Sequence, residues 1–137
     1  RVDLTAVFDA HEQVLALADS ASRNLALANT RARLRMATLY AEAQAHGLLV
    51  AGTGNKIEDF GVGFFTKYGD GGVDLSPIAD LYKSEVYTVG RHLGVQKAIL
   101  DAATTDGLWN DGRTDEDQLG ARYAELEQAM EFARTAR

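Results

Sequence analysis

The segment Gly47–Asp59, GLLVAGTGNKIED, decides the fold class. Its apolar run Leu48–Ala51 lies between Gly47 and Gly52. A short apolar run between two turn residues predicts a buried strand of a parallel sheet. The next residues, TGN at 53–55, then turn the chain into a short helix that carries two carboxylates. A strand, a turn and a helix in this order favour an α/β layer structure.

Helices are predicted on both sides of this segment. The longest begins at Ser20 or Ser22 and runs to His46, where Gly47 ends it in the left-handed conformation. Its predicted buried face consists of Leu25, Ala28, Ala32, Met36, Leu39 and Ala43. The other helices are expected to begin near Thr5, to span Lys83–Leu93 and Val95–Ala102, and to extend from a cap at Thr114 to about Ala136, with 104–113 as a loop.

The predicted sheet is small. Apart from Leu48–Ala51, only Val2–Leu4 has the pattern of a strand end. One clear strand is too little sheet for an independent α/β domain. The chain is therefore either a piece of a larger domain or contains further strands.

The composition limits the kinds of function that the chain can have. The chain has 137 residues, no cysteine and a formal net charge of -6. These values predict one domain without disulfides or a thiolate metal site, and they disfavour nonspecific binding to nucleic acid. No run of about 18 apolar residues and no signal-peptide pattern is present, so we expect a cytoplasmic protein with no membrane partner. The spacing of His11, His46 and His92 does not predict a metal site.

A glycine-rich segment follows the predicted strand and helix. Gly61–Leu75, GVGFFTKYGDGGVDL, combines five glycines with Lys67, Asp70 and Asp74. Each glycine costs roughly 0.5–1 kcal/mol of extra backbone entropy when it is ordered in a helix or strand. Their concentration here predicts a backbone that approaches a ligand closely.

Thr53 and Glu58 are candidates for a phosphate site. Ligands of open parallel sheets collect at the carboxyl ends of strands, where helix N-termini offer free N–H donors. A threonine hydroxyl there suits phosphate, and a carboxylate suits Mg²⁺ that bridges phosphates. The alternative is that Thr53 caps a helix and Glu58 stabilises its dipole. Neither GxGxxG nor the Walker pattern occurs at this point.

Further candidates flank this segment. Asn29 and Arg33 are four residues apart and share a helix face, where they could hold a carboxylate or phosphate, or form a solvated surface with a salt bridge. Lys67 and Lys83 could contact phosphoryl oxygens, or serve solubility alone. Asp74 could accept from a ribose hydroxyl or a ligand amine, or form a turn.

Three blocks in order carry a family resemblance. They are RARLRM at 31–36, LLVAGTGNKIEDFGVGFFTKYGDGGVDLSPIADLYKSEVY at 48–87, and TTDGLWNDGRTDEDQLG at 104–120. From Val2 to Met130 the chain resembles the NAD synthetase family, of the ammonia-dependent type. The resemblance implies a parallel sheet between helices of the adenine-nucleotide α-hydrolase type, and a homodimer. It also implies conversion of deamido-NAD, ATP and ammonia to NAD, AMP and pyrophosphate through an adenylate, with Mg²⁺ as cofactor.

Residue roles follow from the resemblance at matching positions. It implies ATP contacts, a magnesium ligand and deamido-NAD contacts. The ATP residues are Thr53, Lys83 and Thr105, the metal ligand is Glu58 with Asp59 as a competitor, and the deamido-NAD residues are Asn29, Arg33, Lys67 and Asp74.

The chain also departs from the family pattern. The SGGxDS pyrophosphate loop and the C-terminal tail of the family are absent, and Thr104 stands where a proline is usual. We therefore expect residues 1–137 to be part of one NAD synthetase domain, and the isolated segment to be inactive. Two alternatives stay open: a non-catalytic remnant that binds a dinucleotide or dimerises, and a related amidotransferase synthetase of the ATP-pyrophosphatase type. The nitrogen source, ammonia or glutamine, is also open.

Overall fold

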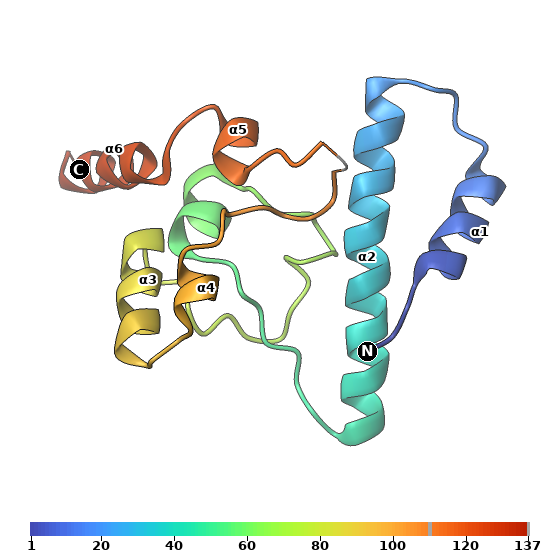
Figure 1. Cartoon of the computed structure of the whole chain (residues 1–137), viewed down its shortest axis with the longest axis horizontal. Helices are drawn as coiled ribbons and strands as arrows, with labels where there is room; N and C mark the ends of the chain where they lie inside the picture. The colour runs from blue at the N-terminus through green and yellow to red at the C-terminus, as the bar shows by residue number, and fades with distance from the viewer. Residues whose placement is uncertain (110, 137) are drawn as a thin grey trace. The chain divides into compact units, whose positions relative to one another are not determined.

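A computed structural model describes residues 1–109 and 111–136. Figure 1 shows the elements in chain order and labels the α-helices; η1 is the name of a π-helical segment between α2 and α3. They are α1 (Thr5–Leu15), α2 (Ala21–His46), η1 (Ile57–Val62), α3 (Lys83–His92), α4 (Lys97–Leu100), α5 (Asp115–Leu119) and α6 (Tyr123–Thr135). No helix of the described residues is both long enough and apolar enough to cross a membrane.

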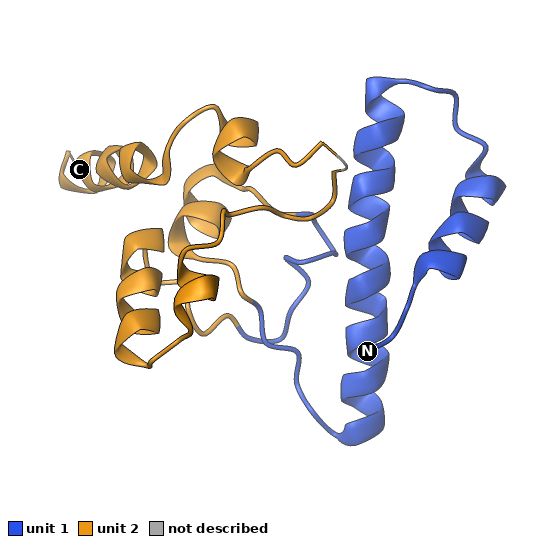
Figure 2. Ribbon diagram, viewed as in Figure 1, with its two compact units in different colours: residues 1–52, 66–75 blue, residues 53–65, 76–137 orange. Residues whose placement is uncertain are grey.

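The elements form two compact units, coloured separately in Figure 2. Unit 1 consists of residues 1–52 and 66–75, and unit 2 of residues 53–65 and 76–137. The expectation that the whole chain is part of one domain stays a prediction.

The predicted strand Leu48–Ala51 is wrong for the residues that the structure describes. Only an isolated parallel bridge, between Ala51 and Leu75, is present there. The Gly52 N–H donates to the Leu75 carbonyl at 2.8 Å, and the Val50 carbonyl accepts from the N–H groups of Asp74 at 3.0 Å and Leu75 at 3.4 Å. These bonds do not extend into a strand among the described residues. Leu48 and Leu49 remain 66% and 69% exposed. A parallel strand needs neighbouring strands and cover on both faces. Within unit 1, residues 48–51 pair only with the short segment at residues 74–75, and Val50 alone among them is buried. The possible strand end at Val2–Leu4 is likewise not a strand.

Unit 1 is built on a helical hairpin of α1 and α2 (Figure 1). The predicted ends of α2 are confirmed: the Ser20 hydroxyl accepts from the Arg23 N–H, and Gly47 has the left-handed φ of 65°. These contacts satisfy backbone groups that a helix end leaves unpaired.

The predicted buried face of α2 is partly correct. Ala28, Ala32 and Ala43 are buried, whereas Leu25 and Leu39 are exposed and Leu27 is buried in their place. Met36 is half-buried. Residues 66–75 cover only part of this long helix, so the predicted face is not buried along its full length.

The loop 66–75 packs closely on α2. Gly69 is buried, and a Cβ placed on it would lie 2.9 Å from the Cβ atoms of Ala32 and Thr66. A Cβ on Gly72 would lie 3.2 Å from the Met36 side chain. At these two positions the absent side chain allows backbone to approach α2. The predicted close approach to a ligand stays a prediction.

Gly69→Ala is therefore expected to lower the free energy of unfolding by about 1–3 kcal/mol, the usual cost of overpacking. The matched control is Gly61→Ala, where the nearest atom to the added Cβ is the flexible Met130 Sδ at 2.6 Å. Urea unfolding of both variants measures the difference. Equal stabilities would contradict the close packing of the loop.

Unit 2 contains the remaining helices. The predicted helix Lys83–Leu93 is confirmed to within its last residue, and Val95–Ala102 is reduced to α4. The single helix predicted from Thr114 is wrong, because Gly120 adopts a left-handed φ of 69° and separates α5 from α6. The predicted cap is confirmed, since the Thr114 hydroxyl accepts from the Asp117 N–H.

Candidate functional site

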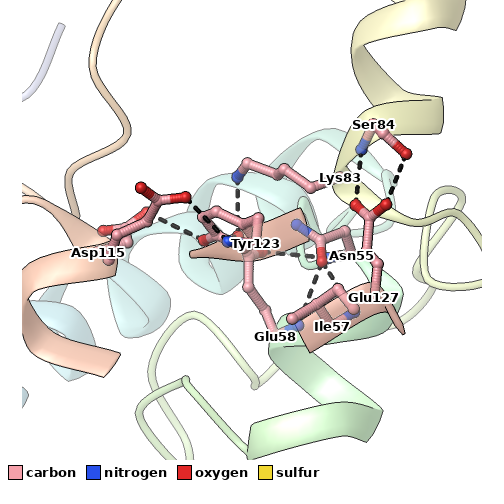
Figure 3. Close-up of polar contacts among 9 residues, drawn as sticks. Asn55, Ile57, Glu58, Lys83, Ser84, Asp115, Tyr123 and Glu127 are labelled. Carbon is pink, nitrogen blue, oxygen red and sulfur yellow. Dashed lines mark hydrogen bonds and ion pairs between the residues drawn. The ribbon is translucent and has the colours of Figure 1, made fainter. Parts of the chain in front are cut away.

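Two residues predicted from the sequence meet inside unit 2. Glu58 lies on η1 and Lys83 begins α3. The Lys83 Nζ donates to the Glu58 Oε1 at 2.8 Å (Figure 3). Their side chains are only 19% and 14% exposed, for Lys83 and Glu58 respectively. The structure therefore brings a predicted phosphate ligand and a predicted metal ligand together as a largely buried ion pair.

The start of η1 fixes Glu58. Asn55 is buried, and its Oδ1 accepts from the N–H groups of Ile57 at 2.9 Å and Glu58 at 3.2 Å. The backbone N–H of Asn55 donates to the Glu58 Oε2 at 3.2 Å. Asn55, rather than Thr53, thus supplies the side-chain oxygen at this helix start. Completely buried Ile57 anchors the same turn.

The start of α3 is fixed by α6. Glu127 accepts from the Ser84 N–H at 2.9 Å and from the Ser84 hydroxyl at 2.8 Å (Figure 3). A carboxylate at this position satisfies free N–H groups and favours the helix dipole. Because Lys83 precedes Ser84, this contact also fixes the backbone from which the ammonium extends.

Two residues that sequence reasoning missed complete the cluster. The Tyr123 hydroxyl lies 2.7 Å from the Glu58 Oε1, to which it donates, and 3.3 Å from the Asp115 Oδ2. The Lys83 Nζ lies 4.7 Å from the centre of the Tyr123 ring, within the range of a cation–π contact. Asp115 is 7% exposed, and its Oδ1 has no hydrogen-bond partner among the described residues.

Burial and hydrogen bonding move the pKa values of these groups in different directions. Burial acts to raise the pKa of Glu58, but hydrogen bonds from Lys83 and Tyr123 outweigh it and leave that pKa lowered. Burial raises the pKa of Asp115, and the charge of Lys83 offsets this only in part. Burial and the Glu58 carboxylate raise the pKa of the Tyr123 phenol, which therefore stays a hydrogen-bond donor.

These directions predict opposite effects of acid on stability. The pKa of Glu58 in the folded protein lies below its unfolded value of 4.5. The stabilising contribution of the Glu58 carboxylate is therefore lost as the pH falls from 4.5 through the folded-state pKa. The pKa of Asp115 in the folded protein lies above its unfolded value of 3.8. The contribution of Asp115 to the free energy of unfolding therefore increases as the pH falls through the folded-state pKa toward 3.8. Urea unfolding of Glu58→Gln and Asp115→Asn across the acid range should give differences from wild type with opposite slopes. Slopes of the same sign would contradict the opposite directions of the two pKa shifts.

The cluster fits Mg²⁺ only in a restricted way. The described residues contain no group of three or more metal-ligating side chains. They do contain two carboxylates, those of Glu58 and Asp115, that both contact the Tyr123 hydroxyl. The Asp115 Oδ1 has no hydrogen-bond partner among these residues. Mg²⁺ commonly takes one or two carboxylates and completes its shell with water and substrate phosphates. The residues therefore fit a magnesium ion that arrives with a phosphate ligand, and not an all-protein cage.

The other candidates of unit 2 lie outside these contacts. Thr53 and Thr105 are exposed. The Thr105 hydroxyl accepts from the Gly107 N–H at 3.0 Å, and its neighbour Thr104 accepts from the Asp115 N–H through its carbonyl at 3.0 Å. Asp59 lies against Gly54, where an added Cβ would be 2.3 Å from the Asp59 Oδ1.

Unit 1 holds the other four predicted residues. The Arg33 Nε donates to the Lys67 carbonyl at 3.1 Å, and the Asn29 Oδ1 accepts from the Thr66 hydroxyl at 2.8 Å. These bonds join α2 to the glycine-rich loop. Arg33 and Lys67 are exposed, so their charged groups are open to solvent.

Asp74 joins three parts of unit 1. Its Oδ2 accepts from the Val50 N–H at 2.8 Å, and its Oδ1 accepts from the Tyr40 hydroxyl at 3.1 Å. Tyr40 was not predicted, because its contact is 34 residues away and has no local signal. The exposed Asp74 thus has a structural role in addition to the ligand role predicted for it.

Comparison with known proteins gives a consistent result. The NAD synthase family model matches residues 1–137. A relative from Methanococcoides burtonii, named NH(3)-dependent NAD(+) synthetase, is 44% identical over 95% of this chain and 48% of its own length. One of the same name from Archaeoglobus fulgidus is 49% identical over 79% of this chain and 43% of its own length. The chain spans about half the length of the curated relatives it matches.

Solved structures are similar as well. The NMN synthetase of Francisella tularensis superposes with a TM-score of 0.85 at 37% identity, covering 95% of this chain and 52% of that one. The NH3-dependent NAD synthetase of Campylobacter jejuni gives 0.64 at 31% identity, covering 72% and 41%. These likenesses support the adenine-nucleotide α-hydrolase type of fold, although its parallel sheet is not present in residues 1–109 and 111–136. The chain belongs to the NAD synthase family.

Proposed function

We propose that the protein carrying this chain is an ammonia-dependent NAD synthetase that uses ATP to amidate deamido-NAD. The observation that carries the proposal is the buried pair of Lys83 and Glu58, 2.8 Å apart, within a chain that matches the family over its whole length. An ammonium and a carboxylate held together on adjacent helix starts suit the phosphates of a nucleotide and their counter-ion.

The proposed reaction has two steps. A carboxylate oxygen of the nicotinate group bonds to the α-phosphorus of ATP, and the bond to the bridging oxygen breaks to release pyrophosphate. The nitrogen of ammonia then bonds to the activated carbonyl carbon, AMP leaves, and a proton is released. The protein contributes alignment and charge neutralisation in both steps.

The ATP residues lie in unit 2. We assign Lys83, Thr53 and Thr105 to the phosphates and nucleoside of ATP, and Glu58 to Mg²⁺, with Asp59 as the competing ligand. When bound, Mg²⁺ supplies neutralisation of phosphate charge. The Lys83 ammonium exchanges its bond to Glu58 for bonds to phosphate oxygens, while the Asn55 N–H and the Tyr123 hydroxyl keep Glu58 oriented.

The deamido-NAD residues lie in unit 1. The exposed Arg33 and Lys67 provide positive charge for phosphate or carboxylate groups of this substrate. Asn29 adds an amide group on the same face of α2. Asp74 accepts from a ribose hydroxyl, with a backbone position fixed by its own contact to Val50.

A second substrate is favoured by one observation. The solved structure that covers 95% of this chain with a TM-score of 0.85 is named NMN synthetase. The same amidation chemistry on a nicotinate mononucleotide would give NMN. The curated relatives at 44% and 49% identity are named for NAD instead, and for this reason we propose deamido-NAD as the main substrate.

The test is an assay of the full-length protein with ATP, Mg²⁺ and ammonium. Deamido-NAD and nicotinate mononucleotide are supplied in separate reactions, and NAD, NMN, AMP and pyrophosphate are quantified. Stoichiometric NAD, AMP and pyrophosphate support the proposal, and a preference for the mononucleotide supports the second candidate. ATP cleavage with neither product would overturn both, and glutamine in place of ammonium tests the nitrogen source.

Assembly and location are also proposals. We propose a cytoplasmic homodimer, from the family resemblance alone, and light scattering of the full-length protein tests the dimer. The family match disfavours a related amidotransferase synthetase. The remnant hypothesis would be supported by nucleotide binding without any product.

A further inference from the structure

We infer that Tyr123 is a positioning residue that sets both Glu58 and Lys83 for the nucleotide. This inference rests on the proposed function, because it concerns the residues assigned to ATP and Mg²⁺. Tyr123 lies at the start of α6, and its contact with Glu58 spans 65 residues of chain. Nothing in the local sequence around Tyr123 predicts this role.

Tyr123 contacts the two residues through different parts of its side chain. Its hydroxyl donates to the Glu58 Oε1 at 2.7 Å, and its ring face lies 4.7 Å from the Lys83 ammonium. The hydroxyl therefore acts on the carboxylate, and the ring acts on the ammonium. Tyr123 is itself buried, so it acts through these neighbours.

The hydroxyl has a specific role when Lys83 changes partner. The Glu58 Oε1 accepts from both Lys83 and Tyr123. When the ammonium moves to a phosphate, the Glu58 carboxylate loses its counter-charge, and without the Tyr123 hydroxyl only the Asn55 N–H would still donate to it. A buried carboxylate with so few partners is destabilising. The Tyr123 hydroxyl keeps that oxygen hydrogen-bonded and in place, so that the carboxylate would be ready to hold Mg²⁺. Loss of the hydroxyl should therefore weaken metal-dependent binding.

The side chain can be dissected with two substitutions. Tyr123→Phe removes the hydroxyl and keeps the ring, whereas Tyr123→Leu removes both. The matched control is Tyr82→Phe, because the Tyr82 hydroxyl donates to Glu131 on α6 and its ring lies 4.2 Å from the Lys56 ammonium. Tyr82 also adjoins Lys83 in the sequence, which makes it a strict control for disturbance of α3.

The readout is binding, measured by calorimetry on the full-length protein with α,β-methylene-ATP, which resists cleavage. For Tyr123→Phe, we expect the Mg²⁺ concentration for half-maximal binding to rise about tenfold, as for one lost hydrogen bond to a charged group. Binding at saturating Mg²⁺ should change little. Tyr123→Leu should also weaken binding at saturating Mg²⁺ severalfold, and Tyr82→Phe should do neither.

A double-mutant cycle completes the test. If Tyr123 acts through Glu58, Tyr123→Phe should add little to the Mg²⁺ requirement of Glu58→Gln. Independent, multiplying effects would overturn the inference. A Tyr123→Phe protein with a lowered melting temperature but an unchanged Mg²⁺ requirement would also overturn it, because that result describes a purely structural residue. Wild-type protein that fails to bind the analogue with Mg²⁺ would overturn the proposed function itself.

Discussion

Lys83→Met is expected to abolish NAD synthesis by the full-length protein and to lower its free energy of unfolding by up to about 3 kcal/mol. Removal of one partner from a buried ion pair leaves the other charge uncompensated, at a cost of about 3–5 kcal/mol when burial is complete. Glu58 retains 14% exposure and two other hydrogen bonds, so we expect the lower end of that range. The measurements are product formation and urea unfolding.

The double variant Lys83→Met with Glu58→Gln separates the two effects. It replaces the pair with neutral side chains of similar size, and the new amide oxygen can still accept from the Tyr123 hydroxyl or the Asn55 N–H. We expect stability to return to within about 1 kcal/mol of wild type, because a neutral pair avoids the desolvation of both charges. NAD synthesis should remain absent. Recovery of activity in the double variant would show that the ammonium is not required for ATP.

Ile57→Ala is expected to lower the free energy of unfolding by about 3 kcal/mol, within the range of roughly 2–5 kcal/mol for such truncations. Ile57 is completely buried and lies between Asn55 and Glu58 in the turn that fixes the carboxylate. Ile57→Val, which removes one methylene group, is the control and should cost about 1 kcal/mol. Urea unfolding followed by tyrosine fluorescence or circular dichroism measures both. Equal effects for the two variants would mean that the site collapses around the truncation.

The loss of packing at Ile57 should also affect the position of Glu58 and, through it, Mg²⁺ binding. Because Ile57 and Glu58 share the Asn55 amide oxygen as acceptor, a shifted backbone at one residue moves the other. Under the proposed function, Ile57→Ala should raise the Mg²⁺ requirement even at temperatures where the protein is folded.

Local signals in the sequence predicted several features correctly. Ser20 and Gly47 mark the ends of α2, because capping depends on residue types within one turn. The strand-turn-helix pattern also placed Glu58 on a short helix, and the structure pairs it with Lys83. The roles of both residues in ATP and metal binding stay predictions.

Features that depend on distant residues were not predictable. Tyr123 joins the cluster through contacts that span 65 residues to Glu58 and 8 residues to Asp115, and no residue pattern at a helix start indicates such a partner. The strand at Leu48–Ala51 failed for a related reason, since a parallel strand exists only when neighbouring strands supply its hydrogen bonds. Gly120 was a local signal that the single-helix prediction overlooked.

The division of the chain into two units has a consequence for how substrate choice can change. All residues assigned to ATP or metal belong to unit 2, and all residues assigned to deamido-NAD belong to unit 1. Under the proposed assignments, substitutions on α2 and the loop 66–75 should change the preference for the nicotinate substrate and leave the residues assigned to ATP and Mg²⁺ unchanged. A change of preference between a dinucleotide and a mononucleotide is then expected to require changes in unit 1 alone.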